Sequence, residues 1–140
     1  MTVKIKLVSK GDYKFLYELL SERDEHTNIS HKKMPTFSQH VRFVESKPYS
    51  KWYIIIFNNQ KIGSIYITQN NEIGIFLKKG FHGIGIGKKA LRLLMEIKPK
   101  ERYLANINPR NKRSIDFFKK NGFNLIQYTY ELRIKKRQIN

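Results

Sequence analysis

The chain has 140 residues, with 28 lysines and arginines against 11 acidic residues and no cysteine. That length allows one domain with one core, spanning residues 1–140, and a hydrophobic content of 40% is enough to fold it. The lack of cysteine excludes disulfides, thiolate nucleophiles and cysteine-ligated metal sites. No apolar run is long enough to span a membrane, and the N-terminus lacks the apolar stretch of a signal peptide. We therefore expect a cytoplasmic protein that has no membrane partner.

The net charge of +17 would attract any polyanion, including nucleic acid, anionic lipid and phosphorylated small molecules. The basic residues are spread through nearly every segment and form no separate tail, which favours a general lysine-rich composition over a dedicated binding arm. The same composition leaves only eleven carboxylates as candidates for a general base.

The first third of the chain predicts one strand and two helices. Residues Val3–Val8 alternate between apolar and polar as in a strand. The segment Ser9–Asp12 has the spacing of a capping box, and the apolar residues after it predict a helix that reaches about Glu22. A second capping box at Thr36–Gln39 predicts a short helix that ends near Ser46.

The middle of the chain predicts an antiparallel meander. Trp52–Phe57 and Lys61–Thr68 are two strands joined by a tight turn, and Glu72–Leu77 is a third.

The second half combines two helices with two further strands. A glycine-rich loop over Gly80–Gly87 leads into an amphipathic helix that reaches Ile97. Tyr103–Ile107 is predicted as a strand, Asn111–Asn121 as a helix and Phe123–Ile134 as a final strand. Together the elements predict an α+β domain.

The glycine-rich loop is the sharpest chemical feature of the sequence. Gly83, Gly85 and Gly87 allow a tight turn and a close approach of the backbone to a ligand. Their amides precede a helix, whose N-terminus carries a partial positive charge, and Lys88 and Lys89 add to it. The residues by themselves therefore indicate a ligand that bears phosphate.

A second motif follows one helix and one strand later, as Asn111-Lys-Arg-Ser114 and then Gly122-Phe123. Together with His82-Gly-Ile-Gly85-Ile-Gly87, it resembles the acetyl-coenzyme A site of the GNAT superfamily of N-acetyltransferases. The resemblance covers about residues 51–123 and implies a mixed, mostly antiparallel sheet flanked by about four helices. It also implies direct transfer of the acetyl group of acetyl-coenzyme A to a primary amine, without a covalent enzyme intermediate.

The resemblance assigns cofactor contacts to this chain. The strand Ile75–Leu77 would offer backbone groups to the pantetheine arm, and the loop His82–Gly87 would hold the pyrophosphate, although His82 replaces the usual Gln or Arg. The expected cofactor-binding residues are Ile75, Phe76, Leu77, His82, Gly83, Ile84, Gly85, Ile86, Gly87, Lys88, Asn111, Ser114, Phe118, Lys119 and Lys120, and no metal is expected.

The catalytic groups are less clear from the resemblance. Family members that acetylate protein N-termini carry a Glu and a Tyr at positions that here hold Asn106 and Phe118. The remaining candidates for the general base are Glu72 and His31, with His40 as a further histidine. The thiolate could take its proton from Tyr128, Tyr130 or solvent.

The acceptor is expected between the 24–46 segment and the final strand, and a small or nucleotide-linked amine, such as an amino sugar, suits that basic and aromatic segment. Two alternatives stay open: an acetyltransferase of protein or tRNA amines, and a non-catalytic nucleic-acid-binding module. Only about seventeen residues follow Phe123, so the last strand is expected to be unpaired or completed by a partner chain, in a monomer or a homodimer.

Overall fold

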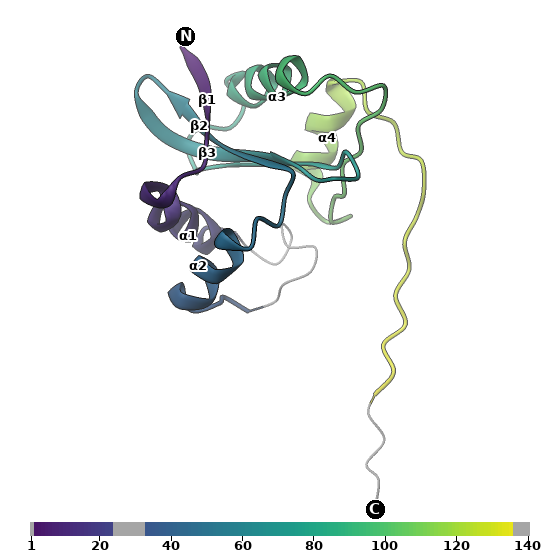
Figure 1. Ribbon diagram of the computed structural model, residues 1–140. Helices are drawn as coiled ribbons and strands as arrows, with labels where there is room; N and C mark the ends of the chain where they lie inside the picture. Colours follow the sequence, from purple (N-terminus) through teal and green to yellow (C-terminus); the bar gives the residue numbers. More distant parts are fainter. Residues whose placement is uncertain (1, 24–32, 136–140) are drawn as a thin grey trace, which may run out of the picture.

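The computed structural model describes residues 2–23 and 33–135, in which four antiparallel strands form one sheet in the order β1-β2-β3-β4 (Figure 1). Two asparagines with positive φ, Asn58 at 48° and Asn59 at 68°, make the tight hairpin between β2 and β3. The strands are β1 Val3–Leu7, β2 Lys51–Phe57, β3 Gln60–Ile67 and β4 Ile73–Leu77.

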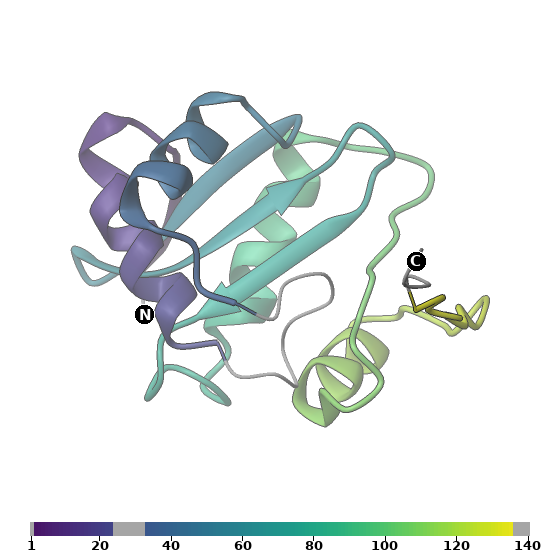
Figure 2. The same ribbon diagram turned by 90° about the horizontal axis from the view of Figure 1, so that it is seen from below.

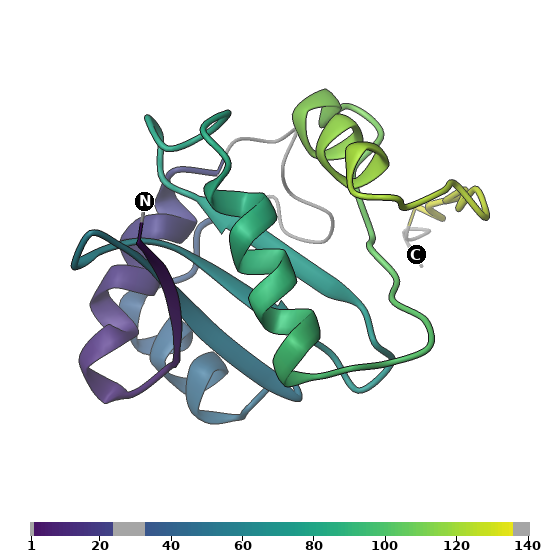
Figure 3. The same ribbon diagram turned by 90° about the horizontal axis from the view of Figure 1, so that it is seen from above.

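Helices cover both faces of the sheet. Figures 1 and 2 show α1 and α2 on one face, and Figure 3 shows α3 crossing the other. The predicted capping boxes are both present, at Ser9 with Asp12 and at Thr36 with Gln39. The helical elements are the short 3₁₀ turn η1 Lys10–Asp12, then α1 Tyr13–Ser21, α2 Phe37–Glu45, α3 Ile86–Ile97 and α4 Lys112–Lys120.

The alternation of side chains along the strands divides the core into two clusters. The larger one joins the sheet to α3 and includes Ile55, Ile65, Ile86 and Leu94, each with no exposed surface. The smaller one, on the opposite face, joins Leu16, Val44 and Ile54. Because both faces are covered, the central strands are apolar on both sides, and their sequences are nearly continuous apolar runs.

Two of the six predicted strands are not strands in the described chain, which corrects the expectation for Tyr103–Ile107 and Phe123–Ile134. In the first, only Leu104 makes a parallel bridge, to Glu72. The second extends away from the body and pairs with no strand within the described residues (Figure 1). The physical reason is that a strand needs a neighbouring edge to satisfy its backbone groups, and neither segment has one along its length. The α+β class and the mostly antiparallel sheet are confirmed.

None of the described helices is long and apolar enough to cross a membrane. Within residues 2–23 and 33–135, no three histidine or acidic side chains gather as a metal-ion site.

Candidate active site

The outer edge of β4 is open beyond its first residue. Ile73 donates its amide to the carbonyl of Leu104 at 2.7 Å, so its backbone groups point away from β3. Backbone groups of alternate residues in a strand point to the same side, so Ile75 and Leu77 present their N–H and C=O to this edge. Phe76 has the opposite orientation and pairs toward Ser64 of β3. Ile75 and Leu77 can therefore pair with an extended ligand, as the family resemblance implies for pantetheine, whereas Phe76 faces β3.

The glycine-rich loop follows β4 and ends at the N-terminus of α3. Gly83 and Gly85 have φ of 75° and 89°, a backbone conformation that favours glycine, and Gly85 is the N-cap of α3. The first helical hydrogen bond runs from the Lys89 amide to the Gly85 carbonyl at 3.2 Å. No protein group in the described chain accepts from the amides of residues 83–88. Unpaired donors at a helix N-terminus suit the binding of an anion.

The residues at the end of this loop and the start of α3 differ in which of their groups a ligand could reach. Ile86 has no exposed surface, so only its amide is available to a ligand, whereas Ile84 is exposed and Lys88 lies on the surface. A Cβ atom on Gly87 would lie 2.9 Å from the ring of Phe117. Gly87 is therefore required for the packing of α4 against α3.

The imidazole of His82 lies beside the loop, close to the Leu77 carbonyl. Burial and the charge of Arg113 lower its pKa below the ordinary value of 6.5, while Glu22 and the carbonyl partly oppose the shift. His82 is therefore neutral at physiological pH and adds a hydrogen-bonding group rather than a charge.

The asparagine–serine motif begins α4. The Asn111 side chain is the N-cap, and its Oδ1 accepts from the Ser114 amide at 3.2 Å, which explains the three-residue spacing. Phe118 is 4% exposed and packs between Phe117 and Phe123, so the structure places it in the core rather than at a ligand surface.

A cleft of about 400 Å³ lies between α3 and the end of α4. Three cations reach it, Lys88 and Arg92 from α3 and Lys120 from α4, while Lys119 is exposed in the same last turn. Such a cleft suits a phosphate-bearing nucleotide. Sequence reasoning did not single out Arg92, although its place one helical turn after Lys88 puts both on one face.

Glu72 is held at the junction of β4 and the 103–107 segment. Its Oε1 accepts from the Thr68 hydroxyl at 2.9 Å, and its Oε2 accepts from the Asn106 side-chain amide at 2.5 Å. Each oxygen keeps a lone pair for a further donor. Asn106 therefore positions the carboxylate of Glu72, which lies just before β4.

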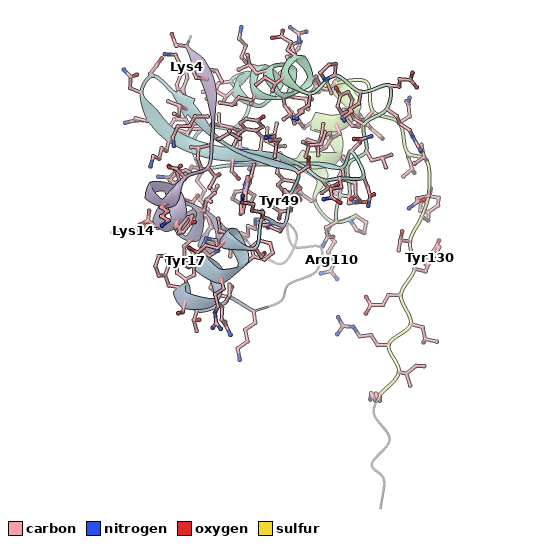
Figure 4. The ribbon with its side chains drawn as sticks, in the orientation of Figure 1. Lys4, Lys14, Tyr17, Tyr49, Arg110 and Tyr130 are labelled. Atoms are coloured by element: carbon pink, nitrogen blue, oxygen red, sulfur yellow. The ribbon has the colours of Figure 1, made fainter. Side chains whose placement is uncertain are left out.

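On the face of the sheet that α1 and α2 cover, four residues form an aromatic and cationic cluster that the sequence did not predict. Tyr49 and Tyr66 stack with ring centroids 3.7 Å apart and their planes nearly parallel. The Arg23 guanidinium lies 4.7 Å from the centroid of the Phe76 ring. Tyr49 is labelled in Figure 4, below the sheet. No local pattern marks these residues, because they come from four separate parts of the chain: the segment just after α1, the α2–β2 connection, strand β3 and strand β4.

Burial determines the protonation states of this cluster. It raises the pKa of Tyr49 and of Tyr66, so both phenols stay neutral. It lowers the pKa of Arg23, which is still charged because a guanidinium titrates far above physiological pH. The Arg23 Nε atom is buried and has no hydrogen-bond partner within the described residues, and no described carboxylate forms an ion pair with Arg23.

The other candidate catalytic groups lie elsewhere. His31 is outside the described residues. His40 is 4% exposed and packs against Tyr17 at 5.3 Å between α1 and α2, and burial lowers its pKa. Tyr128 and Tyr130 are exposed on the C-terminal segment, where Figure 4 shows Tyr130 away from the sheet. Within a single chain, Glu72 is thus the described candidate base closest to the open edge of β4.

Comparison with known proteins gives consistent results. The model of the Acetyltransferase (GNAT) family matches residues 13–123, while no curated protein sequence matches. A domain from Methanocaldococcus jannaschii is similar in structure, with a TM-score of 0.77, 23% identity and 93% of each chain covered.

Two further structures share the fold and carry a cofactor or its analogue. yncA of Salmonella typhimurium, solved with its cofactor acetyl-CoA, has a TM-score of 0.70 and 18% identity, and the alignment covers 88% of this chain and 80% of yncA. AAC(6')-Iy, in complex with the bisubstrate analogue CoA-S-monomethyl-acetylneamine, has a TM-score of 0.71 and 15% identity, with 97% of this chain and all of the other covered.

The family match covers most of the chain and includes the strand edge, the glycine-rich loop and the start of α4 described above. The chain belongs to the Acetyltransferase (GNAT) family and is an acetyl-CoA-dependent N-acetyltransferase.

Proposed function

We propose that this chain acetylates the primary amine of a small, nucleotide-linked amino sugar and that Glu72 is its general base. The observation that carries the proposal is the fixed carboxylate of Glu72, held by Thr68 and Asn106 beside the open edge of β4. A base must lie within hydrogen-bond reach of the proton it removes, and a carboxylate oriented by two donors with free lone pairs meets that requirement.

The cofactor would lie across three surfaces of the described chain. The pantetheine arm would pair with the outer edge of β4 at Ile75 and Leu77. The pyrophosphate would bind the unpaired amides of residues 83–88. The nucleotide end would occupy the cleft that Lys88, Arg92 and Lys120 reach.

The chemical step then balances as follows. Glu72 takes a proton from the ammonium of the acceptor, and the neutral amine attacks the thioester carbonyl. The C–N bond forms, the nitrogen releases its second proton to solvent as the C–S bond breaks, and the coenzyme thiolate takes a proton from solvent. Solvent has this role in a single chain because Phe118 is buried in the core and Tyr130 is on the C-terminal segment.

The choice of acceptor is supported by the cluster of Arg23, Tyr49, Tyr66 and Phe76. A half-buried guanidinium without a described acidic partner suits the phosphates of a nucleotide, and stacked tyrosines suit a flat base or a sugar ring. A Cβ on Gly74 would lie 2.1 Å from the Tyr66 ring, so the glycine lets that ring lie flat against β4.

The test is the Glu72→Gln variant, assayed with nucleotide-linked and free amino sugars. Turnover should fall by about 100-fold or more near neutral pH, because a glutamine cannot take the proton. The loss should shrink as the pH rises toward the pKa of the amine. The affinity for acetyl-CoA, measured by calorimetry, should not change, since the Glu72 carboxylate bonds to Thr68 and Asn106, which are outside the proposed cofactor surfaces.

Glu96→Gln, an exposed change of the same kind on α3, is the matched control and should leave turnover unchanged. Wild-type turnover in Glu72→Gln would remove Glu72 as the base. A preference for free amines, peptides or tRNA over the nucleotide-linked sugar would overturn the acceptor but not the base.

A further inference from the structure

The C-terminal segment of residues 124–135, called here the C-terminal arm, has the pattern of a strand without a sheet. From Ile126 to Ile134 every second residue is apolar, and the residues between them are polar. The rings of Tyr128 and Tyr130 have centroids 6.4 Å apart. The arm nonetheless makes no backbone hydrogen bond to the rest of the described chain.

The apolar side of the arm is exposed to solvent in the single chain. Its side chains are 62% exposed at Ile126, 90% at Tyr130 and 86% at Leu132. A soluble protein rarely leaves a continuous apolar surface of this kind uncovered unless another surface binds there. The pattern therefore indicates a partner for the arm.

The same chain carries a matching unpaired edge at residues 103–107. Leu104 uses both its N–H and its C=O toward β4, bonding to Asn71 at 2.9 Å and Ile73 at 2.7 Å. By alternation, Tyr103, Ala105 and Ile107 direct their backbone groups to the opposite side, and no backbone group of the described chain pairs with them. Their side chains pack on the core, which holds this edge in place.

We propose that the C-terminal arm pairs with the 103–107 edge of a second copy of this chain, in a reciprocal, two-fold exchange. The arm is anchored at Phe123, whose amide bonds to the Phe118 carbonyl at 2.9 Å, and from there it runs away from its own body (Figure 1). One exchange satisfies both unpaired edges of both copies, as a closed two-fold interface requires.

The available surface is sufficient for a stable dimer. Two largely exposed tyrosines carry roughly 300–500 Å² on each arm. Each of the two arms would also bury a similar area on the other copy. The total therefore reaches the roughly 1,200 Å² that a stable interface buries. The exchanged strand would lie next to Asn106, so it would also form a wall beside the Glu72 carboxylate. This inference concerns assembly and does not depend on the acceptor.

The absence of native cysteine allows a direct cross-linking test. One chain carries Asn106→Cys, a second carries Thr129→Cys, and neighbouring polar arm positions are scanned in the same way because the register is not specified. Mixing the two chains under mild oxidation should give a disulfide-linked heterodimer. A chain that carries both cysteines and instead closes an internal disulfide as a monomer would show that the arm pairs with its own edge, and no disulfide at any position would also overturn the proposal.

Sedimentation velocity provides the second test. Tyr128→Glu with Tyr130→Glu, on the apolar side of the arm, should weaken the dimer by about 100-fold or more, because pairing would bury unpaired charges. The matched control, Gln127→Glu with Thr129→Glu, adds the same charge on the polar side and should stay within about threefold of the wild type. Loss of the dimer in both variants alike, or a wild-type monomer at every protein concentration, would contradict the exchange.

The salt dependence is also distinctive. Two copies that each carry +17 repel each other, so added salt should strengthen the dimer. Self-association mediated by contaminating nucleic acid would weaken with salt instead.

Discussion

Strand β2 and the C-terminal arm are both rich in residues that favour strands, yet only β2 is a strand. Ile54 and Ile55 of β2 have no exposed surface, because β1 and β3 flank the strand and helices cover both its faces. The arm has the more regular alternation, but its Tyr130 is 90% exposed. The difference shows that a strand depends on a neighbouring edge at least as much as on the preferences of its own residues.

The largest expected effect contrasts a leucine of the body with a leucine of the arm. Leu94→Ala should lower the free energy of unfolding by about 2–5 kcal/mol, because Leu94 is fully buried between α3 and the sheet and its loss leaves a cavity. Leu132→Ala removes the same atoms from a side chain that is 86% exposed in the single chain. This change should alter the free energy of unfolding by less than about 0.5 kcal/mol. Urea unfolding of the dilute protein measures both. Equal losses would mean that the arm packs on its own body.

The next effect separates binding from folding in the glycine-rich loop. Gly85→Glu should weaken acetyl-CoA binding by about 100-fold, because it adds bulk and negative charge where the amides of residues 83–88 are unpaired. Gly80→Glu is the matched control, since Gly80 has a similar φ of 90° and open space around it. Calorimetric titration, with circular dichroism to confirm folding, checks the pair. A folded Gly85→Glu protein with normal affinity would remove the loop as the pyrophosphate site.

The third comparison sets a buried ion cluster against an exposed ion pair. Asp12 is 1% exposed and pairs with Lys6 at 2.6 Å and Lys61 at 2.7 Å, whereas Glu131 and Arg133 pair on the surface of the arm. Burial raises the pKa of Asp12, but the bonds from Lys6, Lys61 and the Ser9 amide outweigh it and lower the pKa to about 2.

Because the pKa of Asp12 is lowered on folding, its contribution to stability is present above its unfolded pKa of 3.8 and is lost as the pH falls toward 2. Asp12→Asn should therefore lower the free energy of unfolding by about 2 kcal/mol at neutral pH, and the difference should disappear under strongly acidic conditions. Glu131→Gln should have an effect below about 0.5 kcal/mol throughout. Unfolding curves across the pH range test both; an Asp12 effect that persists unchanged in strong acid would show that the lost charge is not the cause.

Much of the fold could be predicted because its signals are local. The capping boxes at Ser9 and Thr36, the Asn58-Asn59 turn and the glycine before α3 each depend on residues within a few positions of one another. The two cofactor motifs have the same local character, since Asn111 and Ser114 are joined by a single capping bond. The sequence by itself therefore determined the meander, the helices and the glycine-rich loop at the start of α3.

The contacts of the proposed acceptor side could not be predicted, because they join residues far apart in the chain. Glu72 and Asn106 are separated by 34 positions, and Arg23, Tyr49 and Phe76 come from three different parts of the sequence. Only the tertiary structure decided which side chains meet there and which strands find a neighbour. The physical reason is that propensity and periodicity describe what a segment favours, while hydrogen-bond pairing and burial depend on what another segment places beside it.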